Sequence, residues 1–244
     1  MPTAKAIDLS HHNPEPNWPQ LKAGGILGVI LKATEGTSYV DPTFAARRAA
    51  ALSAGFAVSS YHFFHGNAEK EMAHYLKTVA PVQGERVCID HEAEATLQQL
   101  EDAVAYLVSV RPDLQISIYS GHLIKDQLGS KTSEILSKNT SLWVAQYNDK
   151  GPSWPKQVWP QWSLWQFTDK AKVAGISQPV DGNQFNGSDE NLVKWFGPVQ
   201  SEPAPSPEPA PEPGPATVSI AIEAPEGVQV SITVNGKEIH NGSV

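Results

Sequence analysis

The sequence predicts an α/β barrel of eight strands with an incomplete ring of outer helices, followed by a small all-β module. Three observations support this fold class. Short β-branched or aromatic runs alternate with helix-compatible stretches over residues 1–197, which is the order of a β/α barrel. A proline-rich segment, residues 198–216, comes next. The remaining residues, 217–244, alternate apolar and polar side chains as antiparallel strands do.

Eight runs within the first 197 residues have the composition of β-strands. They are Ala4–Ser10, Ile26–Thr34, Phe56–Phe64, Arg86–Glu92, Gln115–Ser120, Ser141–Tyr147, Ser163–Thr168 and Val180–Phe185. A single α/β barrel commonly needs roughly 200–250 residues, so the length fits one such domain. An open, doubly wound sheet is the alternative, because it has the same alternating order.

Three stretches between these strands have the apolar spacing of amphipathic helices: Phe44–Ala54, Glu69–Val79 and Ala95–Val110. The first two end near Gly55 and Pro81, which are typical helix terminators. The later connections are shorter and rich in Pro and Trp. We therefore expect the outer ring of helices to be incomplete.

The predicted linker, residues 198–216, contains eight prolines that alternate with Ala, Ser and Glu. This composition disfavours helices and central strands and favours an extended spacer. Residues 217–244 contain three alternating segments, Thr217–Glu223, Gln229–Val234 and Lys237–His240, and an Asn-Gly turn at 235–236. So short a module buries little core. We expect it to dock on the barrel, to pair with another protein chain, or to contact a surface such as a cell wall.

The formal net charge of −8 is concentrated in the tail, where residues 198–244 carry six Glu against one Lys. No run of basic residues is longer than Arg47–Arg48, although nucleic acids and anionic membranes are bound by clustered basic faces. No segment has the roughly 18 consecutive apolar residues that predict a transmembrane helix. The sequence therefore predicts neither nucleic-acid binding nor membrane insertion.

The single cysteine, Cys88, lies in an apolar run and excludes an intramolecular disulfide. We expect it to be a buried small hydrophobe. The N-terminus lacks the basic start and apolar stretch of a signal peptide. These features predict synthesis in the cytoplasm, so an action on the cell wall, in the periplasm or outside the cell, requires another route of release.

Polar side chains gather at the C-terminal ends of the predicted strands. They are Asp8, Lys32, Glu35, Tyr61, His62, Asp90, Glu92, Tyr119, Tyr147 and Gln166, with Asp181 in the eighth strand. In a parallel barrel these ends face one mouth, where active sites are built. Each residue taken alone is typical of a solvated loop, but their occurrence on every strand predicts a functional site at the mouth.

Asp90 and Glu92 follow the apolar run Val87–Ile89. Residues two apart on a strand share one face, so the two carboxyls point the same way. Such a pair either ionises twice at a like-charge cost or separates its pKa values. Acid/base glycoside chemistry needs that separation, with one carboxyl protonated and another ionised. Capping of a helix N-terminus also uses Asp and Glu, and it is the alternative for this motif taken alone.

Aromatic residues in or beside the strand ends favour a carbohydrate ligand, because flat rings pack against the C–H faces of sugars. They are Tyr61, Phe63, Phe64, Tyr119, Trp143, Tyr147, Trp165 and Phe167. Most of the Phe and Trp residues are equally typical of a hydrophobic core.

A metal site formed from His62, His65, Asp90, His91 and Glu92 is a weaker hypothesis. No His-Glu-x-x-His motif occurs, and alternation along the strand turns His91 away from its acidic neighbours. We therefore expect no metal and no other cofactor. The sequence also lacks the Gly-x-Ser-x-Gly elbow, the Walker loop and the Gly-x-Gly-x-x-Gly fingerprint, which excludes the common serine hydrolases and nucleotide-binding enzymes.

Several segments together resemble the glycoside hydrolase family 25 lysozymes, which occur among bacteriophage endolysins, bacteria and fungi. They are 8–14 (DLSHHNP), 30–41 (ILKATEGTSYVD), 61–63 (YHF), 90–92 (DHE), 143–147 (WVAQY), 165–167 (WQF) and 180–183 (VDGN). The resemblance covers residues 4–197 and leaves out the linker and the tail. It implies an irregular TIM-like barrel and cleavage of the β-1,4 bond between N-acetylmuramic acid and N-acetylglucosamine in peptidoglycan.

At the positions of this sequence that match the family, the resemblance implies that Glu92 is the general acid. It also implies that Asp90 assists on the other side of the sugar. Asp90 would either activate a water or orient the 2-acetamido group of the substrate, and we favour the second route. Asp8 and Asp181 would complete an acidic ring that keeps Glu92 protonated. Lys32, Tyr61, Tyr119 and Gln166 are the candidates for substrate binding, although Lys32 equally fits an ion pair with Asp8 or Glu35.

Two other functions fit parts of the sequence. One is a module that binds peptidoglycan without cutting it, although none of the four acidic positions is empty. The other is a chitinase or glucosaminidase, which would not explain the Lys-Ala-Thr-Glu-Gly segment at 32–36. The family and the sequence together predict a phage or prophage enzyme that reaches the wall through a holin-type membrane lesion, and a bacterial enzyme with an unusual export route is the alternative.

Overall fold

The structure, a computed structural model, describes residues 2–198, 227, 229–234 and 237–243. The chain divides into two compact units, residues 1–203 and residues 204–244. All the residues of the predicted site lie in the first unit. Beyond Pro198, the predicted linker lies outside the described residues, as does the strand predicted at Thr217–Glu223.

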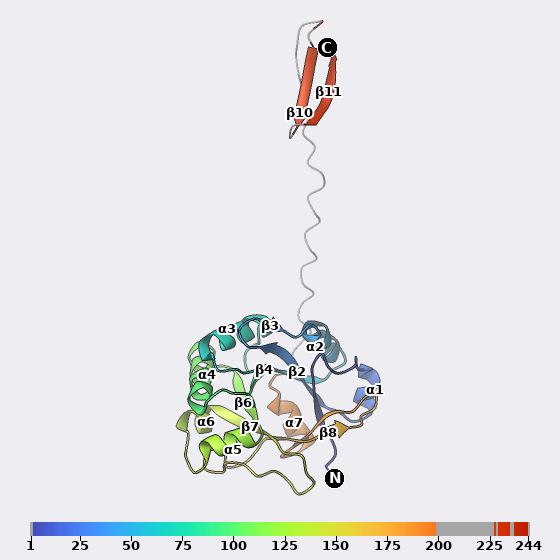
Figure 1. The fold of residues 1–244 in the computed structure, drawn as a ribbon. Helices are drawn as coiled ribbons and strands as arrows, with labels where there is room; N and C mark the ends of the chain where they lie inside the picture. Colours follow the sequence, from blue (N-terminus) through green and yellow to red (C-terminus); the bar gives the residue numbers. More distant parts are fainter. Residues whose placement is uncertain (1, 199–226, 228, 235–236, 244) are drawn as a thin grey trace. The chain divides into compact units, whose positions relative to one another are not determined.

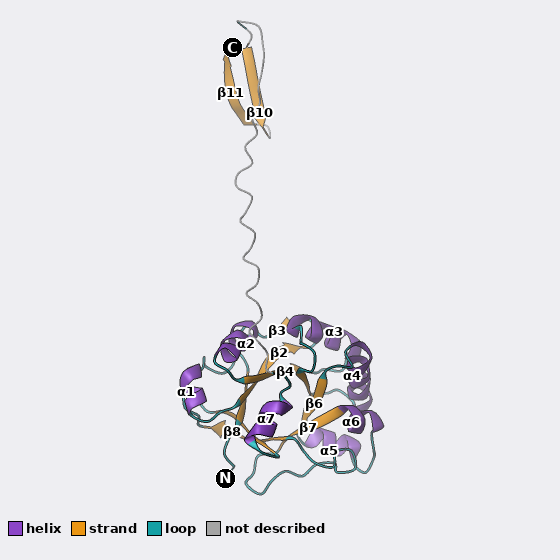
Figure 2. Ribbon diagram, turned by 180° about the vertical axis from the view of Figure 1, so that it is seen from behind, coloured by secondary structure: helices purple, strands orange, loops and turns teal. Residues whose placement is uncertain are grey.

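Eight strands of the first unit form a closed barrel (Figures 1 and 2). In barrel order they are β1 (Ala6–Leu9), β2 (Gly28–Glu35), β4 (Ala57–Phe63), β5 (Arg86–Asp90), β6 (Gln115–Ser120), β7 (Thr140–Ala145), β8 (Leu164–Ala171) and β9 (Val180–Phe185). The barrel closes because β1 pairs with both β2 and β9. The eight predicted strands are confirmed, and the alternative of an open doubly wound sheet is wrong.

The last strand of the barrel runs against its neighbours. The other adjacent strands pair in parallel, whereas β9 is antiparallel to both β8 and β1. The expectation of an all-parallel barrel was therefore wrong for β9. The connection between β8 and β9 is too short for the crossover helix that a parallel strand requires. Because β9 is reversed, its first residues lie at the mouth, and Asp181 pairs in register with Asp8.

The mouth carries one further strand that the sequence did not predict. This strand, β3 (Tyr39–Val40), pairs antiparallel with the end of β2. Its two residues give no periodic signal. It extends the β2 side of the mouth and carries the exposed ring of Tyr39.

Seven helices lie among the described residues: α1 (Trp18–Ala23), α2 (Phe44–Ser53), α3 (Ala68–Val79), α4 (Leu97–Val110), α5 (His122–Leu128), α6 (Glu134–Asn139) and α7 (Asp189–Trp195). The three predicted helices match α2, α3 and α4. A capping box starts α4, where Thr96 Oγ1 accepts from the Gln99 N–H at 3.3 Å and Gln99 Oε1 accepts from the Thr96 N–H at 2.8 Å. The other helices have six or seven residues, too few for a clear period.

Helix α7 closes the end of the barrel opposite the mouth, and Figure 2 looks onto it. Its Trp195 lies 4.2 Å from the guanidinium of Arg86, at the start of β5. A Cβ on Gly28, at the start of β2, would lie 2.3 Å from the ring of Phe196. A side chain at this position would therefore collide with the aromatic residues that close this end of the barrel. Inside the barrel, Ile30, Cys88 and Trp143 pack in one cluster with these aromatic rings. The opposite end of the barrel, at the C-terminal ends of the parallel strands, is the mouth, where a ligand can bind.

The ring of helices is open next to β8 and β9. The described residues 172–179, which connect these strands, contain no helix, whereas α2 to α6 cover the connections between the parallel strands from β2 to β7 (Figure 1). The predicted incomplete ring is therefore confirmed. On this side of the barrel, the N-terminal residues and the end of β8 with its following loop line a pocket.

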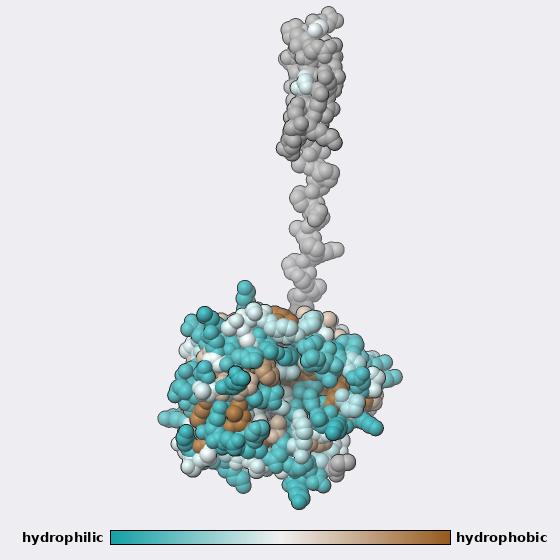
Figure 3. All heavy atoms as spheres, in the orientation of Figure 1, coloured by the Kyte–Doolittle hydropathy of each residue, from teal (hydrophilic) through white to brown (hydrophobic). Residues whose placement is uncertain are grey.

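The face of the first unit seen in Figure 3 is mostly hydrophilic, with scattered apolar patches. The large apolar side chains that stay exposed are Tyr39, Val40, Val82, Val110 and Tyr147. None of the described helices is long and apolar enough to span a membrane. Tyr39 follows β2 and Tyr147 follows β7, so exposed aromatic side chains flank the mouth.

The second unit contains an antiparallel strand pair, β10 (Gln229–Val234) and β11 (Lys237–Ser243). The two strands match the predicted segments, and β11 extends three residues beyond the predicted end at His240. Their register shifts between Ile232 and Thr233. The Asn-Gly turn predicted at 235–236 lies outside the described residues.

Candidate active site

A pocket of about 190 Å³ lies at the mouth of the barrel. Its lining residues are Asp8, Tyr61, Asp90, Glu92, Tyr119, Trp143, Tyr147, Gln166 and Asp181. Seven of the eight residues predicted from the sequence therefore line one pocket, although they come from six different strands or strand ends. The eighth, Lys32, is not among them. We call this space the catalytic pocket.

Strand register explains how the acids meet. Asp90 ends β5 and lies opposite Phe63 and Tyr119 of the neighbouring strands. Asp8 of β1 lies opposite Asp181 of the reversed β9. The four carboxyl groups share a small pocket that has no basic side chain in its lining, so each carboxylate raises the cost of ionising its neighbours.

Asp8 is a buried carboxyl that amide groups hold in place. It is 6 % exposed. Asn183 Nδ2 donates to one of its oxygens at 2.7 Å, and Gln166 Nε2 donates to both at 3.1 and 3.2 Å. Burial and the charge of Asp181 raise the pKa of Asp8 well above its ordinary value, and the two amides oppose that rise.

Asp90 is as buried as Asp8 but lacks comparable support. It is 5 % exposed, and its Oδ1 has no hydrogen-bond partner among the described residues. Burial raises the pKa of Asp90 well above its ordinary value, and the charges of Glu92 and Asp8 raise it further. A ligand that brings an N–H or O–H group to this carboxyl would satisfy a buried polar group.

Glu92 lies two residues beyond the end of β5 and reaches the same pocket. Burial of its carboxyl raises the pKa of Glu92, and the charge of Asp181 adds to the rise. Burial also raises the pKa of Asp181 itself, to about 6. The pocket thus favours the protonated forms of its carboxyls, and a glutamic acid in such surroundings is suited to donate a proton.

Gln166 connects the acids to two tyrosines. Its Oε1 accepts hydrogen bonds from Tyr119 Oη at 2.9 Å and from Tyr147 Oη at 2.8 Å. Its Nε2 donates to Asp8. These contacts use both ends of the amide and fix its orientation. Gln166 therefore sets the positions of Asp8 and of both phenol groups.

Comparison with known proteins identifies the family. The model of the family described as glycosyl hydrolases family 25 matches residues 7–176. The chain belongs to this family. The predicted resemblance is therefore confirmed, and the protein is a glycoside hydrolase of the lysozyme-like, muramidase type.

Individual relatives agree with the family. Lysozyme M1 of Streptomyces globisporus is 28 % identical over 211 residues, which are 78 % of this chain and 70 % of that protein. The lysozyme of Streptococcus phage Cp-7 is 27 % identical over 210 residues, which are 80 % of this chain and 59 % of that protein. The bacterial lysozyme structure from Streptomyces coelicolor has a TM-score of 0.70 at 26 % identity, covering 80 % of this chain and 98 % of that chain.

Lys32 of this glycosyl hydrolase lies beside the pocket instead of lining it. Its Nζ donates to Glu35 Oε2 at 2.6 Å and lies 5.0 Å from the centre of the Phe63 ring. Of the two ion pairs that the sequence allowed for Lys32, the structure contains the one with Glu35. The positive charge still opposes the rise in pKa of Asp90 and Glu92.

Sequence reasoning placed Tyr147 at the mouth but gave no catalytic or substrate-binding role to Tyr147, Trp143 or Asn183. Trp143 and Tyr147 line the pocket, and Asn183 holds Asp8 while accepting from Trp143 Nε1 at 2.7 Å. Asn183 lies two residues after Asp181, and alternation along a strand would have placed it on the same face. Trp143 was interpreted only as an aromatic near a strand end.

The histidines of the metal hypothesis point to other partners. Buried His62 contacts Glu71 of α3 through Nε2 at 2.8 Å. His91 contacts Gln127 of α5 through Nε2 at 2.8 Å, so it faces away from the pocket, as strand alternation predicted. His65 contacts Glu35 at 3.2 Å. Among the described residues, no three ligand-type side chains are grouped to hold a metal ion.

Proposed function

We propose that the protein is a lysozyme that hydrolyses the β-1,4 bond between N-acetylmuramic acid and N-acetylglucosamine in bacterial peptidoglycan. The observation that carries this proposal is the convergence of four carboxyl groups and tyrosine side chains in one pocket. Paired carboxyls with separated roles are the usual machinery for breaking a glycosidic bond. The names of the relatives from Streptomyces globisporus and Streptococcus phage Cp-7 support peptidoglycan as the substrate.

Glu92 acts as the general acid in this proposal. It protonates the oxygen of the leaving N-acetylglucosamine as the bond from C1 of the muramic acid breaks. The raised pKa of Glu92 supports this role, because the proton must be present before the reaction begins. Burial of the Glu92 carboxyl maintains that pKa and the charge of Asp181 adds to it, while Asp8 acts in the same direction on Asp90.

Asp90 orients the 2-acetamido group of the muramic acid. The acetamido N–H would donate to Asp90, and the acetamido oxygen would attack C1 as the leaving oxygen departs. Water would then open the ring intermediate and give its proton to Glu92. The unsatisfied oxygen of Asp90 supports this assignment. In the alternative route, Asp90 activates water directly. The first route retains the configuration at C1 and the second inverts it, so the anomer that forms first, followed by NMR, separates them.

The substrate contacts are proposed for Tyr61, Tyr119 and Gln166 in the pocket and for Lys32 at its edge. The tyrosines offer ring faces to the sugar and hydroxyls to its edge. The protein would act without a cofactor, because protonation and attack by the substrate's own amide need none.

The experiment is digestion of purified peptidoglycan by the wild type and by Glu92→Gln, followed by reduction and mass analysis of the new sugar ends. Reduced muramic acid from the wild type, and a rate about 10²–10⁴ times lower from the variant, is the expected result. Reduced glucosamine would indicate a glucosaminidase instead. No new ends from the wild type would favour a module that binds the wall without cutting it.

The biological role that we propose is lysis by a phage or prophage, which the phage relative supports. The enzyme would be made in the cytoplasm and reach the wall through a holin-type membrane lesion. Expression in a host with and without a holin tests this. Lysis only with the holin is expected, and lysis at the same rate without it would contradict the role.

The residues after the barrel would attach the enzyme to the cell wall or to another protein chain. An extended, semi-rigid spacer holds a catalytic domain near a surface and so raises its local concentration there. Removing residues 198–244 should weaken binding to intact walls while leaving cleavage of soluble fragments. Unchanged binding to walls would contradict this role.

A further inference from the structure

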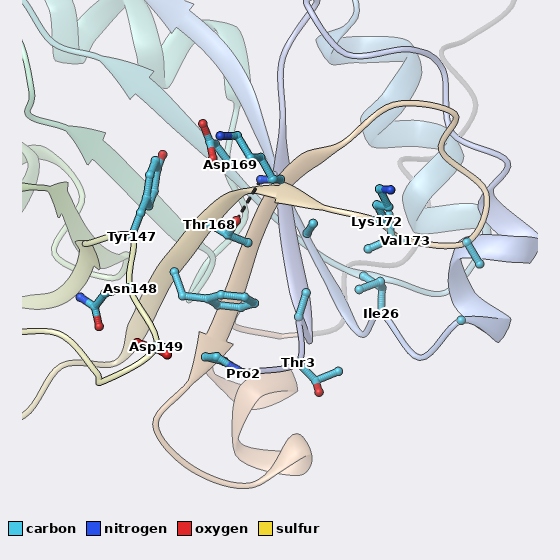
Figure 4. Close-up of a pocket in the computed structure, with 16 residues that line it drawn as sticks. Pro2, Thr3, Ile26, Tyr147, Asn148, Asp149, Thr168, Asp169, Lys172 and Val173 are labelled. Atoms are coloured by element: carbon cyan, nitrogen blue, oxygen red, sulfur yellow. Dashed lines mark hydrogen bonds between the residues drawn. The ribbon is translucent and has the colours of Figure 1, made fainter.

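A second pocket, much larger than the catalytic pocket, opens beside it (Figure 4). Its volume is about 840 Å³, compared with about 190 Å³ for the catalytic pocket. Apolar side chains contribute to its lining, among them Phe167, Ile26 and Val173, and charged side chains, among them Asp149 and Lys172, also line it. We call it the side pocket.

The side pocket exists because the last barrel strand is reversed. The connection from β8 to β9 has no helix, and the register of the two strands shifts twice, near Gln166 and near Thr168. The end of β8 and the following loop therefore curve past the N-terminal residues and enclose a hollow on the outer face of the barrel (Figure 4). In a regular barrel a crossover helix would cover this face.

Tyr147 joins the two pockets. It lines both of them, and its hydroxyl donates to Gln166 in the catalytic pocket at 2.8 Å. Asp169, which lines the side pocket, lies close enough to Asp181 of the catalytic pocket to raise its pKa. Tyr147 is therefore a wall common to both pockets, and a ligand that occupied both would pass this residue.

The two pockets suit different parts of one substrate. Each muramic acid of peptidoglycan carries a short peptide with small apolar side chains, a free carboxylate and, in many walls, a free ammonium group. The catalytic pocket is small and lined mainly by acids and polar side chains, which fits the sugars at the bond to be cut. The side pocket has the volume for a peptide chain, apolar surface for small side chains, and both signs of charge.

The charged side chains of the side pocket are available to a ligand. Asp149 and Lys172 come from opposite walls (Figure 4) and are exposed. Within the part of the chain that the structure describes, neither side chain has an ion-pair partner. Two unlike charges held apart on facing walls are complementary to a peptide that carries an ammonium and a carboxylate.

We propose that the side pocket binds the stem peptide of the peptidoglycan strand whose glycosidic bond lies in the catalytic pocket. Asp149 receives the ammonium group of the peptide, Lys172 receives a carboxylate, and Phe167 and Val173 contact its small side chains. This assignment rests on the proposed function, because it requires peptidoglycan in the catalytic pocket. It makes the enzyme prefer strands that still carry their peptides.

The first test compares two substrates, soluble glycan strands with stem peptides and the same strands after an amidase has removed the peptides. The variant is the charge swap Asp149→Lys with Lys172→Glu, and the control is Glu69→Lys with Lys77→Glu on the outer helix α3. We expect the swap to lower the ratio of kcat/KM on peptide-bearing strands to kcat/KM on peptide-free strands about three- to tenfold, through KM. The control should keep the wild-type ratio.

The outcomes separate this proposal from the proposed function. An equal loss on both substrates, or an unchanged ratio in the charge swap, overturns the assignment of the side pocket while leaving the lysozyme activity in place. A wild type that cleaves neither substrate contradicts the proposed function instead. Normal thermal unfolding of the swap variant excludes misfolding as the cause of a lowered ratio.

A second test needs no turnover. The full chain, labelled with ¹⁵N, is titrated with N-acetylmuramic acid carrying a tetrapeptide and, separately, with N-acetylmuramic acid alone. We expect the peptide-bearing ligand to shift the backbone amides of residues 148–149 and 168–173, and the free sugar to leave them in place. The same shifts with both ligands, or none in these segments, would overturn the proposal.

Discussion

The catalytic pocket and the loop between β4 and α3 each adjoin a buried carboxyl group, but the loop supplies Glu71 with donors that Asp90 of the pocket lacks. Glu71 of α3 is 1 % exposed. It accepts from His62 Nε2 at 2.8 Å, from the His65 N–H at 2.9 Å and from the Asn67 N–H at 2.7 Å. Asp90 is similarly buried, yet its Oδ1 has no partner among the described residues.

The pKa values of the two groups move in opposite directions. Burial by itself would raise the pKa of Glu71, but hydrogen bonds from His62, His65 and Asn67 lower it below its ordinary value. Burial raises the pKa of Asp90, and neighbouring acids raise it further. The chain is therefore able to satisfy a buried carboxylate where the fold requires one. Asp90 lacks such donors and lies beside other acids, so a substrate that brings a donor can complete an interaction that the folded chain leaves open.

Among the substitutions that test this comparison, Asp90→Asn should have the largest effect. That effect is on activity. We expect kcat on peptidoglycan to fall about 10²–10³-fold, because an uncharged amide cannot stabilise the developing charge on the acetamido group. The free energy of unfolding should change by no more than about 1 kcal/mol, since no donor loses its partner. Reducing-end assays and urea denaturation measure the two quantities.

Ser120→Ala is a useful control for this substitution, because Ser120 is a buried residue at the end of the neighbouring strand whose hydroxyl donates to the His91 carbonyl at 2.6 Å. It should lower stability more than activity. If Asp90→Asn instead unfolded the protein while the remaining folded fraction kept wild-type kcat, Asp90 would belong with Glu71 as a structural acid.

The sequence predicted the pocket better than the loop, for a physical reason. Strand ends of a barrel converge at one mouth, so Asp8, Asp90 and Gln166 could be grouped from strand positions alone. The contact between His62 and Glu71 depends on how α3 packs on β4, which no local pattern encodes. His62 was consequently interpreted as a residue of the mouth or a metal ligand, whereas it is a buried partner of a helix residue.

The direction of β9 was missed for a related reason. Periodicity identifies a strand but not its orientation, and β-branched composition is the same either way. The short connection, residues 172–179, was the available signal, because a parallel strand needs a crossover of a dozen or more residues. Asp181 was nevertheless assigned to the mouth, since the family resemblance placed it there.

Glu71→Gln should reverse the pattern expected for Asp90→Asn. We expect a loss of about 2–4 kcal/mol in the free energy of unfolding, because the new amide cannot accept all the hydrogen bonds that the carboxylate accepts. Activity at a temperature where the variant is folded should stay within about threefold of the wild type. Urea denaturation of this variant and of Glu69→Gln, an exposed position on the same helix, measures the difference.

A stability loss below about 0.5 kcal/mol, equal to that of a surface substitution, would show that the donors around Glu71 find other acceptors. Glu71 would then not be a carboxylate on which the stability of the fold depends, and the contrast with Asp90 would no longer hold. The pH dependence provides a further check. Glu71 has a lowered pKa, so its contribution is present above its unfolded pKa near 4.5 and is lost as the pH falls through its folded value.

Asp181→Asn should give the smallest change in the free energy of unfolding. The pH dependence of the Asp181 contribution has the opposite sign to that of Glu71, because the pKa of Asp181 is raised and that of Glu71 is lowered. The folded pKa of Asp181 is about 6, above its ordinary value of 3.8, so the folded state binds its proton more tightly than the unfolded state does. Its contribution to stability is therefore present below about pH 4 and is lost as the pH rises through about 6. The asparagine variant should gain stability relative to the wild type as the pH rises from about 4 to about 7, by about 1–2 kcal/mol after solvent screening. Urea denaturation across this range, with the exposed substitution Asp102→Asn as control, measures the gain. Stability curves that stay parallel would mean that burial and the charge of Asp169 do not raise the pKa of Asp181 in the folded protein, and burial of the Glu92 carboxyl would then be the better supported cause of its raised pKa.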